Sequence, residues 1–290
     1  MKIDHTYQKL IEDIKVQAET YSDLQMKSVY AGQKVALDKL HSLLGTLYIK
    51  YGVNGLLKMN ASQKGSIGID KMLIDMGKQL GNDEIEKVTS ILSTVYSDTY
   101  YKNIYTMNKS FKVDLKFDIL KKVNIDAAVN SKLDGELFSK RIWDNKADLI
   151  DKVHSSLLEA FKGNTTIDAI AKQVKDAFSV TAYESSRLVS TENSRIQSQA
   201  SIDMAIDTGV EQHMWSATLD AKTNEEDASY DQKVYDIGDP DEPENPLHPN
   251  CRCCWINIPY KGWTSTQRRD NSTGEDISYT NYADWKKNNI

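Results

Sequence analysis

The feature that most constrains the fold of this chain is the position of its prolines. The first of the five prolines is Pro240, so no proline interrupts a helix in the long stretch before it. Near the N-terminus, apolar and aromatic side chains recur at alternating spacings of four and three, which places them on one face of an α-helix. They are Tyr7, Ile11, Ile14, Ala18 and Tyr21, followed by Leu37, Leu40, Leu44 and Leu47. These patterns predict a mainly α-helical protein that begins with long helices, the first between Asp4 and about Tyr51.

A second helical hairpin is expected after a loop punctuated by four glycines between Gly52 and Gly68. The helix is predicted to start at Asn82, because asparagine can cap free N–H groups, and the acids that follow it suit the positive end of the helix dipole. Tyrosines at helical spacing usually wedge between helices with the hydroxyl at the rim. A stacking platform for nucleic-acid bases is the alternative. The tyrosines are Tyr96, Tyr100, Tyr101 and Tyr105.

Three further helices are predicted between Asn130 and Gly209. The first is strongly amphipathic and ends at Gly163. The second begins at Thr165 or Thr166, either of which can act as the cap, and ends before Ser179. The third covers residues 182–208 and stops at Gly209, because a glycine can adopt the left-handed C-cap conformation.

The remainder of the chain is expected to fold as a small cap, irregular or short-stranded, from Trp215 to about Tyr260. Proline restricts the residue before it to extended geometry, so Pro246 and Pro249 predict a stiff, non-helical arm. Two segments rich in aromatic and β-branched residues are the candidate strands, and they could pair: Val210–Ser216 and Cys253–Ile258. The predicted order is a helical region 1–129, a helical module 130–214, an acidic cap 215–262 and a polar tail 263–290.

Charge is distributed unevenly along the chain, whose net charge is −6. Ten acids and two bases lie between Ala217 and Leu247. Proteins that hold DNA through its phosphates normally present a basic surface, so tight autonomous DNA binding is not expected. The acidic stretch could instead bind a cation or a basic partner surface. In the polar tail, four aromatic residues are expected to dock on a partner: Trp263, Tyr279, Tyr282 and Trp285.

Targeting signals are not evident, and the composition is that of an ordinary soluble globular protein. The sequence shows neither a signal-peptide core nor eighteen consecutive apolar residues, so the product is expected to stay in the cytoplasm without a membrane partner. Its three cysteines lie within four positions of one another, which suits a reducing compartment.

The predicted third helix contains paired polar residues. Arg187 lies four positions before Thr191, and Glu192 lies three before Arg195, so each pair can meet on the helix surface. Contact of both arginines with phosphates is one interpretation. Because Glu192 would compete for Arg195, a local ion pair that braces the helix is the preferred one.

Together these motifs resemble the phage head morphogenesis family, the Mu F-like minor head proteins of tailed bacteriophages. The resemblance covers about residues 130–290 and rests on Phe138–Trp143, the helix with Arg187–Arg195, Trp215–Thr223 and the string His248-Pro249-Asn250-Cys251-Arg252-Cys253. The tail segments Gln267–Glu275 and Tyr279–Trp285 are similar too. The family-motif residues are Trp143, Arg187, Thr191, Glu192, Arg195, Trp215, Asp220, Thr223, Asp231, His248, Pro249, Cys251, Arg252 and Cys253.

This resemblance implies a structural, non-enzymatic role in head morphogenesis. A minor head protein would be made in the host cytoplasm, lie in the capsid interior near the portal vertex and be part of the virion. Its implied partner is the portal protein, with scaffold or major capsid protein as further candidates. It would contact the packaged DNA weakly or accompany it during packaging and ejection.

The sequence departs from the family pattern at positions where metal ligands would be expected. Positions that often hold further cysteine or histidine carry Asn224 and Asp227, and Gln232 stands where glycine is usual after Asp231. Structural zinc takes four ligands, mostly thiolate and imidazole. His248, Cys251, Cys253 and Asp227 could supply them, but the string offers no second pair of thiols, so no bound cofactor is the preferred expectation. The thiols and His248 would then anchor the arm, and Arg252 would pair with an acid.

Catalytic interpretations are weaker. His248 and Cys251 resemble a base and a nucleophile, but such partners usually meet across a fold and not along one turn. Acid pairs such as Asp220 with Asp227, or Asp236 with Asp239, could ligate a hard cation, although the spacing of a calcium loop is missing. The alternative to a structural protein is therefore a metal-dependent nuclease, or another enzyme, that uses the region of His248, Cys251 and Cys253.

Overall fold

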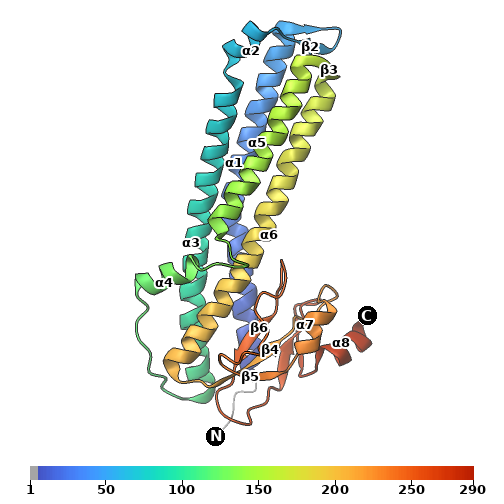
Figure 1. The fold of residues 1–290 in the computed structure, drawn as a ribbon. Coiled ribbons are helices and arrows are strands. Elements are labelled where there is room, and N and C mark those ends of the chain that lie inside the picture. Colours follow the sequence, from blue (N-terminus) through green and yellow to red (C-terminus); the bar gives the residue numbers. More distant parts are fainter. Residues whose placement is uncertain (1–5) are drawn as a thin grey trace. The chain divides into compact units, whose positions relative to one another are not determined.

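The computed structural model describes residues 6–290 and consists mainly of helices, as predicted (Figure 1). Four of them are long: α1 (Tyr7–Tyr51), α3 (Ile69–Phe111), α5 (Phe138–Phe161) and α6 (Ile167–Thr208). Four are short: α2 (Ala61–Ile67), α4 (Lys122–Val129), α7 (Glu225–Tyr230) and α8 (Tyr282–Asn289). In the described part of the chain, no helix is both long and apolar enough to cross a membrane.

The chain forms two compact units. The first, called the motif unit below, comprises the chain up to Ser22, Ser90–Ser131 and Val189–Ile290. The second, called the bundle unit, comprises Asp23–Thr89 and Lys132–Leu188. Helices α1, α3 and α6 contribute residues to both. Each unit thus combines stretches that are distant in sequence, whereas the four segments predicted above follow the order of motifs along the chain and stay a prediction.

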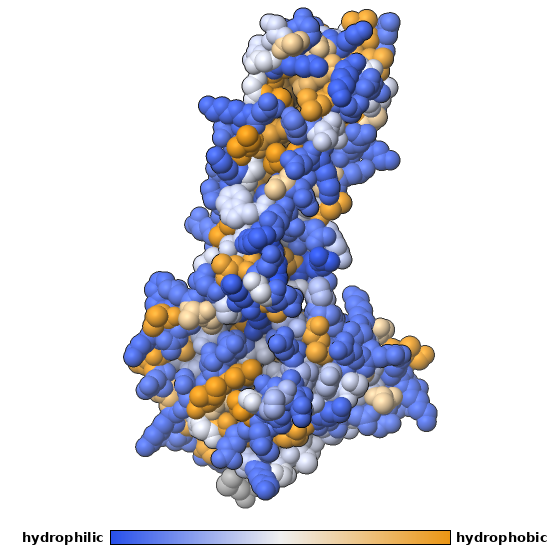
Figure 2. Space-filling view, viewed as in Figure 1, coloured by the Kyte–Doolittle hydropathy of each residue, from blue (hydrophilic) through white to orange (hydrophobic). Residues whose placement is uncertain are grey.

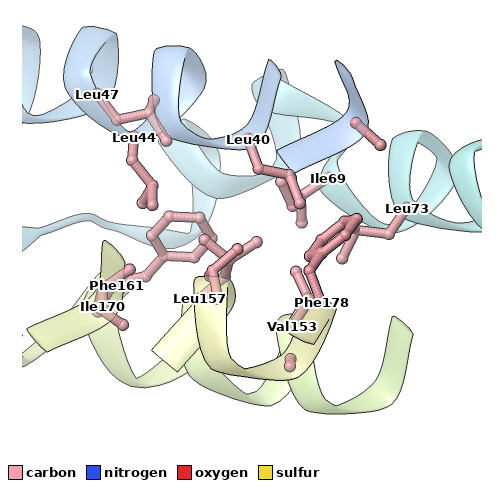
Figure 3. Packing of buried hydrophobic residues seen from close by; sticks show 14 of the residues in the cluster. Leu40, Leu44, Leu47, Ile69, Leu73, Val153, Leu157, Phe161, Ile170 and Phe178 are labelled. Carbon is pink, nitrogen blue, oxygen red and sulfur yellow. The ribbon is translucent and has the colours of Figure 1, made fainter. Parts of the chain in front are cut away.

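Four helical segments surround the core of the bundle unit (Figure 3). The predicted stripe of α1 supplies Leu40, Leu44 and Leu47, each at most 4% exposed. Figure 3 shows these leucines facing the side chains of Leu157 and Phe161 on α5. Burying such side chains stabilises the fold by about 1.5–3 kcal/mol each, so the periodicity seen in the sequence marks the contact that holds this unit together.

One end of the bundle unit is closed by a small antiparallel sheet of β1 (Gly52–Val53), β2 (Leu56–Lys58) and β3 (Lys162–Thr166), in the order β1-β2-β3. The turn between β1 and β2 is Asn54-Gly55, and both residues have positive φ angles of 52° and 75°. Asparagine followed by glycine is the preferred sequence for a two-residue hairpin turn. The glycine-punctuated loop predicted here is therefore a hairpin followed by the short helix α2.

The predicted helix start at Asn82 is wrong, because α3 runs through this position without a break. The preceding residue, Gly81, lies against the indole of Trp143, which a Cβ at this position would meet. The buried carboxylate of Glu84 does not face a helix end, since it pairs at 2.5 Å with the buried ammonium of Lys146. A tertiary contact thus accounts for one of the acids that suggested a helix start.

The predicted break between two helices near Ser179–Thr181 is also wrong, because α6 is continuous. Val180 and Thr181 are β-branched, which lowers helix propensity only slightly. The hydroxyl of Thr181 donates to the carbonyl of Ala177 at 3.1 Å, four residues earlier, and so stays within the helix. Without proline or glycine, this segment had nothing strong enough to end a packed helix.

The motif unit contains the predicted cap sheet. Strands β4 (Gln212–Ser216) and β6 (Cys254–Asn257) pair antiparallel, which confirms that the two candidate strands pair, and β5 (Val234–Asp236) adds to the other edge of β4. The register places Trp215 opposite Trp255. A separate hairpin joins β7 (Gln267–Arg269) and β8 (Asp276–Ser278).

The aromatic residues of the polar tail pack on their own chain, so the expectation that they dock on a partner is wrong. Trp263, Tyr282 and Trp285 are each at most 6% exposed. The indole N–H of Trp285 donates to Asp270 at 2.8 Å, and the hydroxyl of Tyr282 donates to the carbonyl of Asp220 at 3.1 Å. The tail is part of the motif unit.

Tyrosines on α3 divide into two pairs. The rings of Tyr96 and Tyr100 are buried, and their hydroxyls donate to Asp203 at 2.5 Å and to Asp207 at 2.7 Å on α6. This confirms the interhelical wedge for these two residues. Tyr101 and Tyr105 are exposed.

Candidate functional site

The site is organised around Trp215 on the central strand β4. Its side chain is fully buried, packs edge-on against Trp255 at 5.0 Å and donates its indole N–H to the carbonyl of Asp227 at 3.2 Å. A buried tryptophan normally finds a partner for this N–H. The hydrogen bond fixes the short helix α7 against the sheet.

Helix α7 positions the carboxylate of Asp227. Asn224 is the N-cap, and its side chain accepts from the backbone N–H of Asp227 at 2.7 Å. The first turn of this helix carries three acids, which the helix dipole favours. Glu225 and Glu226 point to solvent, whereas Asp227 is 2% exposed. One of the acids in the predicted acidic cap is therefore an interior group.

The arm brings His248 and Cys251 to this carboxylate. Nε2 of His248 lies 2.7 Å from Oδ2 of Asp227, and the thiol of Cys251 donates to Oδ1 at 3.5 Å. The candidate ligand atoms of Asp227, His248 and Cys251 all lie within 4.8 Å of one another. The thiols of Cys251 and Cys253 hydrogen-bond to each other. Of the four predicted zinc ligands, three converge, and the fourth adjoins them.

Ionisation in this cluster follows its hydrogen bonds. Partial burial disfavours the charged imidazole of His248, but the hydrogen bonds to Asp227 and to the carbonyl of Pro249 outweigh burial and raise its pKa. The thiol–thiol hydrogen bond lowers the pKa of Cys251 and raises that of Cys253. Burial raises the pKa of Cys254 to about 12, so that this residue stays a neutral thiol.

Asp220 of the motif pairs with the arginine of the arm. Its carboxylate accepts from both terminal nitrogens of Arg252, one of them at 2.9 Å. Burial alone would raise the pKa of Asp220, but Arg252 and the backbone N–H of Lys222 lower it. Thr223 completes the turn by donating its hydroxyl to the carbonyl of Thr218 at 2.5 Å. The expected pairing of Arg252 with an acid is confirmed.

A second network is built on Asp231 and Arg268. Asp231 accepts from the backbone N–H groups of Ala217 and Tyr282, at 2.9 and 2.8 Å. The guanidinium of Arg268 is fully buried and lies between Asp231, at 2.9 Å, and Glu12 on α1, at 3.4 Å. The sequence interpretation missed Arg268 and Glu12 as site residues. Arg268 stood in a tail segment that the resemblance included, but nothing in the pattern of α1 distinguished Glu12.

Two departures from the family pattern have local explanations. Gln232, in place of the usual glycine, has a φ of 67°, so the backbone still adopts the left-handed conformation that glycine favours. Asn224, in place of a further ligand, is the N-cap of α7.

Glu192 and Arg195 form the predicted ion pair at 2.6 Å, and both are buried. Arg195 also donates to the carbonyls of Ala128 and Val129, at 3.0 and 3.3 Å, and so binds the C-terminal end of α4. Thr191 accepts from the backbone N–H of Asn250, which fastens the arm. The bracing interpretation is confirmed for this part of α6.

The remaining motif residues have contacts in the bundle unit. Arg187 pairs with Glu184 at 3.0 Å. Trp143 is 38% exposed and covers Gly81. Neither residue belongs to the cluster around Asp227.

Three of the acids considered as cation ligands are bound by other side chains of the chain. Asp220 is held by Arg252 and Asp227 by His248, while Asp236 accepts from the side chain of Gln212 at 2.8 Å. Among the described residues, the one group of three or more metal-ligating side chains is that of Asp227, His248 and Cys251.

Cavities of very different size occur in the motif unit. The one that reaches Cys253 and Cys254 has about 20 Å³ of accessible space, enough for roughly one water molecule. A far larger hollow of about 510 Å³ lies between α3, α4 and α6, and its lining includes Tyr96, Val123, Asp203 and Ile206.

The family model described as "Phage Mu protein F like protein" matches residues 151–256. This segment of the chain is therefore similar to the phage Mu protein F-like family. The match includes Trp215, Asp227, His248 and the arm through β6, and it leaves out Glu12 and Arg268. The resemblance to phage head morphogenesis proteins is thereby confirmed.

The chain is also similar to three curated proteins. It is 22% identical to Minor head protein GP7 of Bacillus phage SPP1, over 96% of this chain and 95% of that protein. It is 25% identical to an uncharacterized protein of Haemophilus influenzae, over 50% of this chain and 33% of the relative. It is 23% identical to NAD(+)--arginine ADP-ribosyltransferase EFV of Enterococcus faecalis, over 73% of this chain and 47% of that protein.

The chain thus spans about a third of the length of the Haemophilus relative and about half of the length of the Enterococcus relative. The phage relative, by contrast, is matched along almost its whole length. No solved structure matches the chain.

Proposed function

We propose that this protein is a minor head protein that acts structurally in head assembly by docking on the portal protein inside the prohead. The observation that carries the proposal is the match to a minor head protein over 95% of that protein's length. The site of action would be the capsid interior near the portal vertex, reached from the host cytoplasm during assembly. Scaffold or major capsid protein would be neighbours there.

The use of the motif residues supports a structural role over a catalytic one. Asp220, Asp231 and Glu192 each pair with an arginine of the same unit. Buried charges that lose their partner destabilise a protein strongly, so such pairs specify one packing arrangement. The space beside Cys253 holds roughly one water, whereas a small-molecule site usually has about 300 Å³ or more.

The docking face that we propose is the hollow between α3, α4 and α6. Val123 on α4 and Ile206 on α6 are 67% and 62% exposed there, although both are large apolar residues. Figure 2 shows hydrophobic side chains at the surface over α4. Asp203 and Asp207 add negative charge to the lining. An exposed apolar surface beside charged residues is typical of a protein contact.

The chemistry of this hollow indicates what part of the portal protein would bind. Apolar side chains of the partner would cover Val123 and Ile206, and a lysine or arginine would approach Asp203 and Asp207. Hydrogen bonds from Tyr96 and Tyr100 already hold these two carboxylates in place. We therefore expect an amphipathic, basic segment of the portal protein as the occupant.

Co-expression with the portal protein of the same phage tests this proposal. Size-exclusion chromatography should give one co-eluting complex for the wild type, and Val123→Asp with Ile206→Asp should abolish it. Val180→Asp is the matched control, because Val180 is an exposed valine on α6 in the bundle unit. Separate elution of the wild-type proteins at micromolar concentration would contradict the proposal.

A metal-dependent nuclease is the second candidate, since Asp227, His248 and Cys251 converge as metal donors do. Incubation of linear DNA with the protein, zinc and magnesium distinguishes the two functions. We expect no cleavage above that of a Cys251→Ser variant. Cleavage that depends on Cys251 would favour the enzyme.

A further inference from the structure

We infer that Asp227, His248, Cys251 and Cys253 form a structural zinc site that fastens the arm to helix α7. This inference goes beyond the portal contact and does not depend on it, because the four residues lie around β4 and α7, away from the proposed docking hollow, whose lining includes none of them. The ligand would be one divalent transition-metal ion with thiolate, imidazole and carboxylate donors.

The distances among the donor atoms suit a small tetrahedral ion. With zinc bonds of about 2.0–2.3 Å to oxygen, nitrogen and sulfur, tetrahedral ligand atoms lie roughly 3.3–3.8 Å apart. Nε2 of His248 lies 2.7 Å from Asp227, the sulfur of Cys251 lies 3.5 Å from it, and all three donor atoms fall within 4.8 Å of one another. The side chains would have to move apart only slightly at the His248–Asp227 contact to hold an ion among them.

The hydrogen bonds of His248 require a cation or a second proton at Nε2. Nδ1 lies 2.9 Å from the carbonyl of Pro249, which can only accept, so Nδ1 must carry a proton. In the neutral imidazole, Nε2 then presents a lone pair to the carboxylate of Asp227. An ion between these two acceptors removes the repulsion between the lone pair of Nε2 and the carboxylate of Asp227. A metal-binding histidine typically donates its other N–H to a backbone carbonyl in this way.

Cys253 is placed to supply the fourth donor. Its thiol hydrogen-bonds to that of Cys251, and both residues are 2% exposed. His248 is 31% exposed at its side chain and offers the path from solvent. Two thiolates, one imidazole and one carboxylate select zinc over magnesium or calcium, which prefer oxygen donors throughout.

Cobalt(II) titration tests the inference, because tetrahedral cobalt with thiolate ligands absorbs in the visible range. The full chain, purified reduced and without chelators or a histidine tag, should bind one equivalent of cobalt, and zinc should displace it. Cys251→Ser and His248→Gln should each weaken binding by about 100-fold or more. Cys253→Ser should change the spectrum by removing one thiolate.

Cys254→Ser is the matched control, because Cys254 is the next thiol along the chain and lines a different space, beside Glu12 and Lys15. It should bind cobalt with the wild-type spectrum. Far-UV circular dichroism of each variant checks that the helices are intact. The inference is overturned if the reduced wild type binds no cobalt, or if Cys251→Ser and His248→Gln bind it as the wild type does.

Discussion

The guanidinium of Arg268 lies 2.9 Å from the carboxylate of Asp231, with neither side chain more than 3% exposed. Arg268 also contacts Glu12 on α1 and donates to the carbonyl of Ala217 at 2.6 Å. One buried cation therefore joins the N-terminal helix, the cap sheet and the tail hairpin. The motif unit is held at this point by charge pairing as well as by apolar packing.

Replacing Arg268 by methionine should destabilise the protein by about 3–5 kcal/mol, because it leaves two buried carboxylates without their partner. Arg269→Met is the control. Its pair with Asp13 at 2.9 Å is partly exposed, so the expected loss is about 1 kcal/mol or less. Urea unfolding followed by circular dichroism measures both variants. Equal losses would show that Arg268 carries no special share of the stability.

Alanine substitutions at two helix glycines, Gly45 and Gly81, should change the folding stability differently. Gly45→Ala on α1 should stabilise by about 0.5–1 kcal/mol, because its Cβ meets nothing within 4 Å and the substitution lowers backbone entropy in the unfolded chain. Gly81→Ala on α3 should lose that gain, because its Cβ would meet the ring of Trp143. Thermal unfolding tests the pair, and tryptophan fluorescence should shift only in Gly81→Ala. A similar gain at both sites would refute the close packing of Trp143.

Lowering the pH should reduce the folding stability of the protein because His213 becomes protonated more readily in the unfolded chain. Its ring is buried, stacks on Trp255 at 3.8 Å and contacts Glu242 at 2.7 Å. Burial lowers the pKa of His213 and prevails over Glu242, which raises it. A lowered pKa means that the unfolded chain binds more protons below about pH 6.5, so stability falls as the pH falls below that value.

Urea unfolding of the wild type and of His213→Gln at a series of pH values from 7.5 to 5.5 measures the contribution of His213 to the pH dependence of stability. The wild type should lose stability more steeply than the variant as the pH falls. His248, with its raised pKa, contributes with the opposite sign in both proteins, and their difference removes its effect. A variant that loses stability as steeply as the wild type would contradict the assignment.

Weak DNA contact, which the family resemblance implies, should be limited by the exposed acids of the cap. Glu225, Glu226, Asp241 and Glu244 are exposed, whereas Asp227 and Glu242 have internal partners and must be kept. Neutralising the four exposed acids with glutamine or asparagine should strengthen DNA retardation by about two- to tenfold at low salt. Retardation should fade steeply as salt rises. Unchanged binding would show that these acids face away from DNA.

The sequence predicted the elements that local patterns determine. Apolar periodicity identified α1, and aromatic and β-branched residues between turn formers identified β4 and β6 and their pairing. Sequence patterns gave wrong predictions where the local structure depends on contacts between residues that are distant in the chain. Asn82 and the acids after it resembled a helix start because Lys146, which pairs with the buried Glu84, lies 62 positions after that acid in the chain.

Only the part of the candidate site that lies close together in the sequence was predictable. The string from His248 to Cys253 is local, so its cysteines and histidine stood out, and Asp227 was named as a fourth ligand. Glu12 could not be found, because one acid on a long amphipathic helix looks like any solvated charge until Arg268 is placed beside it.

Hydrogen exchange, measured with and without the portal protein, tests the central claim of a structural docking protein most directly. The account predicts that amides in α4 and in the last turns of α6, around Val123 and Ile206, become protected in the complex. The arm from His248 to Cys253 should exchange at the same rate in both states. Protection confined to that arm, or no protection anywhere, would contradict the account.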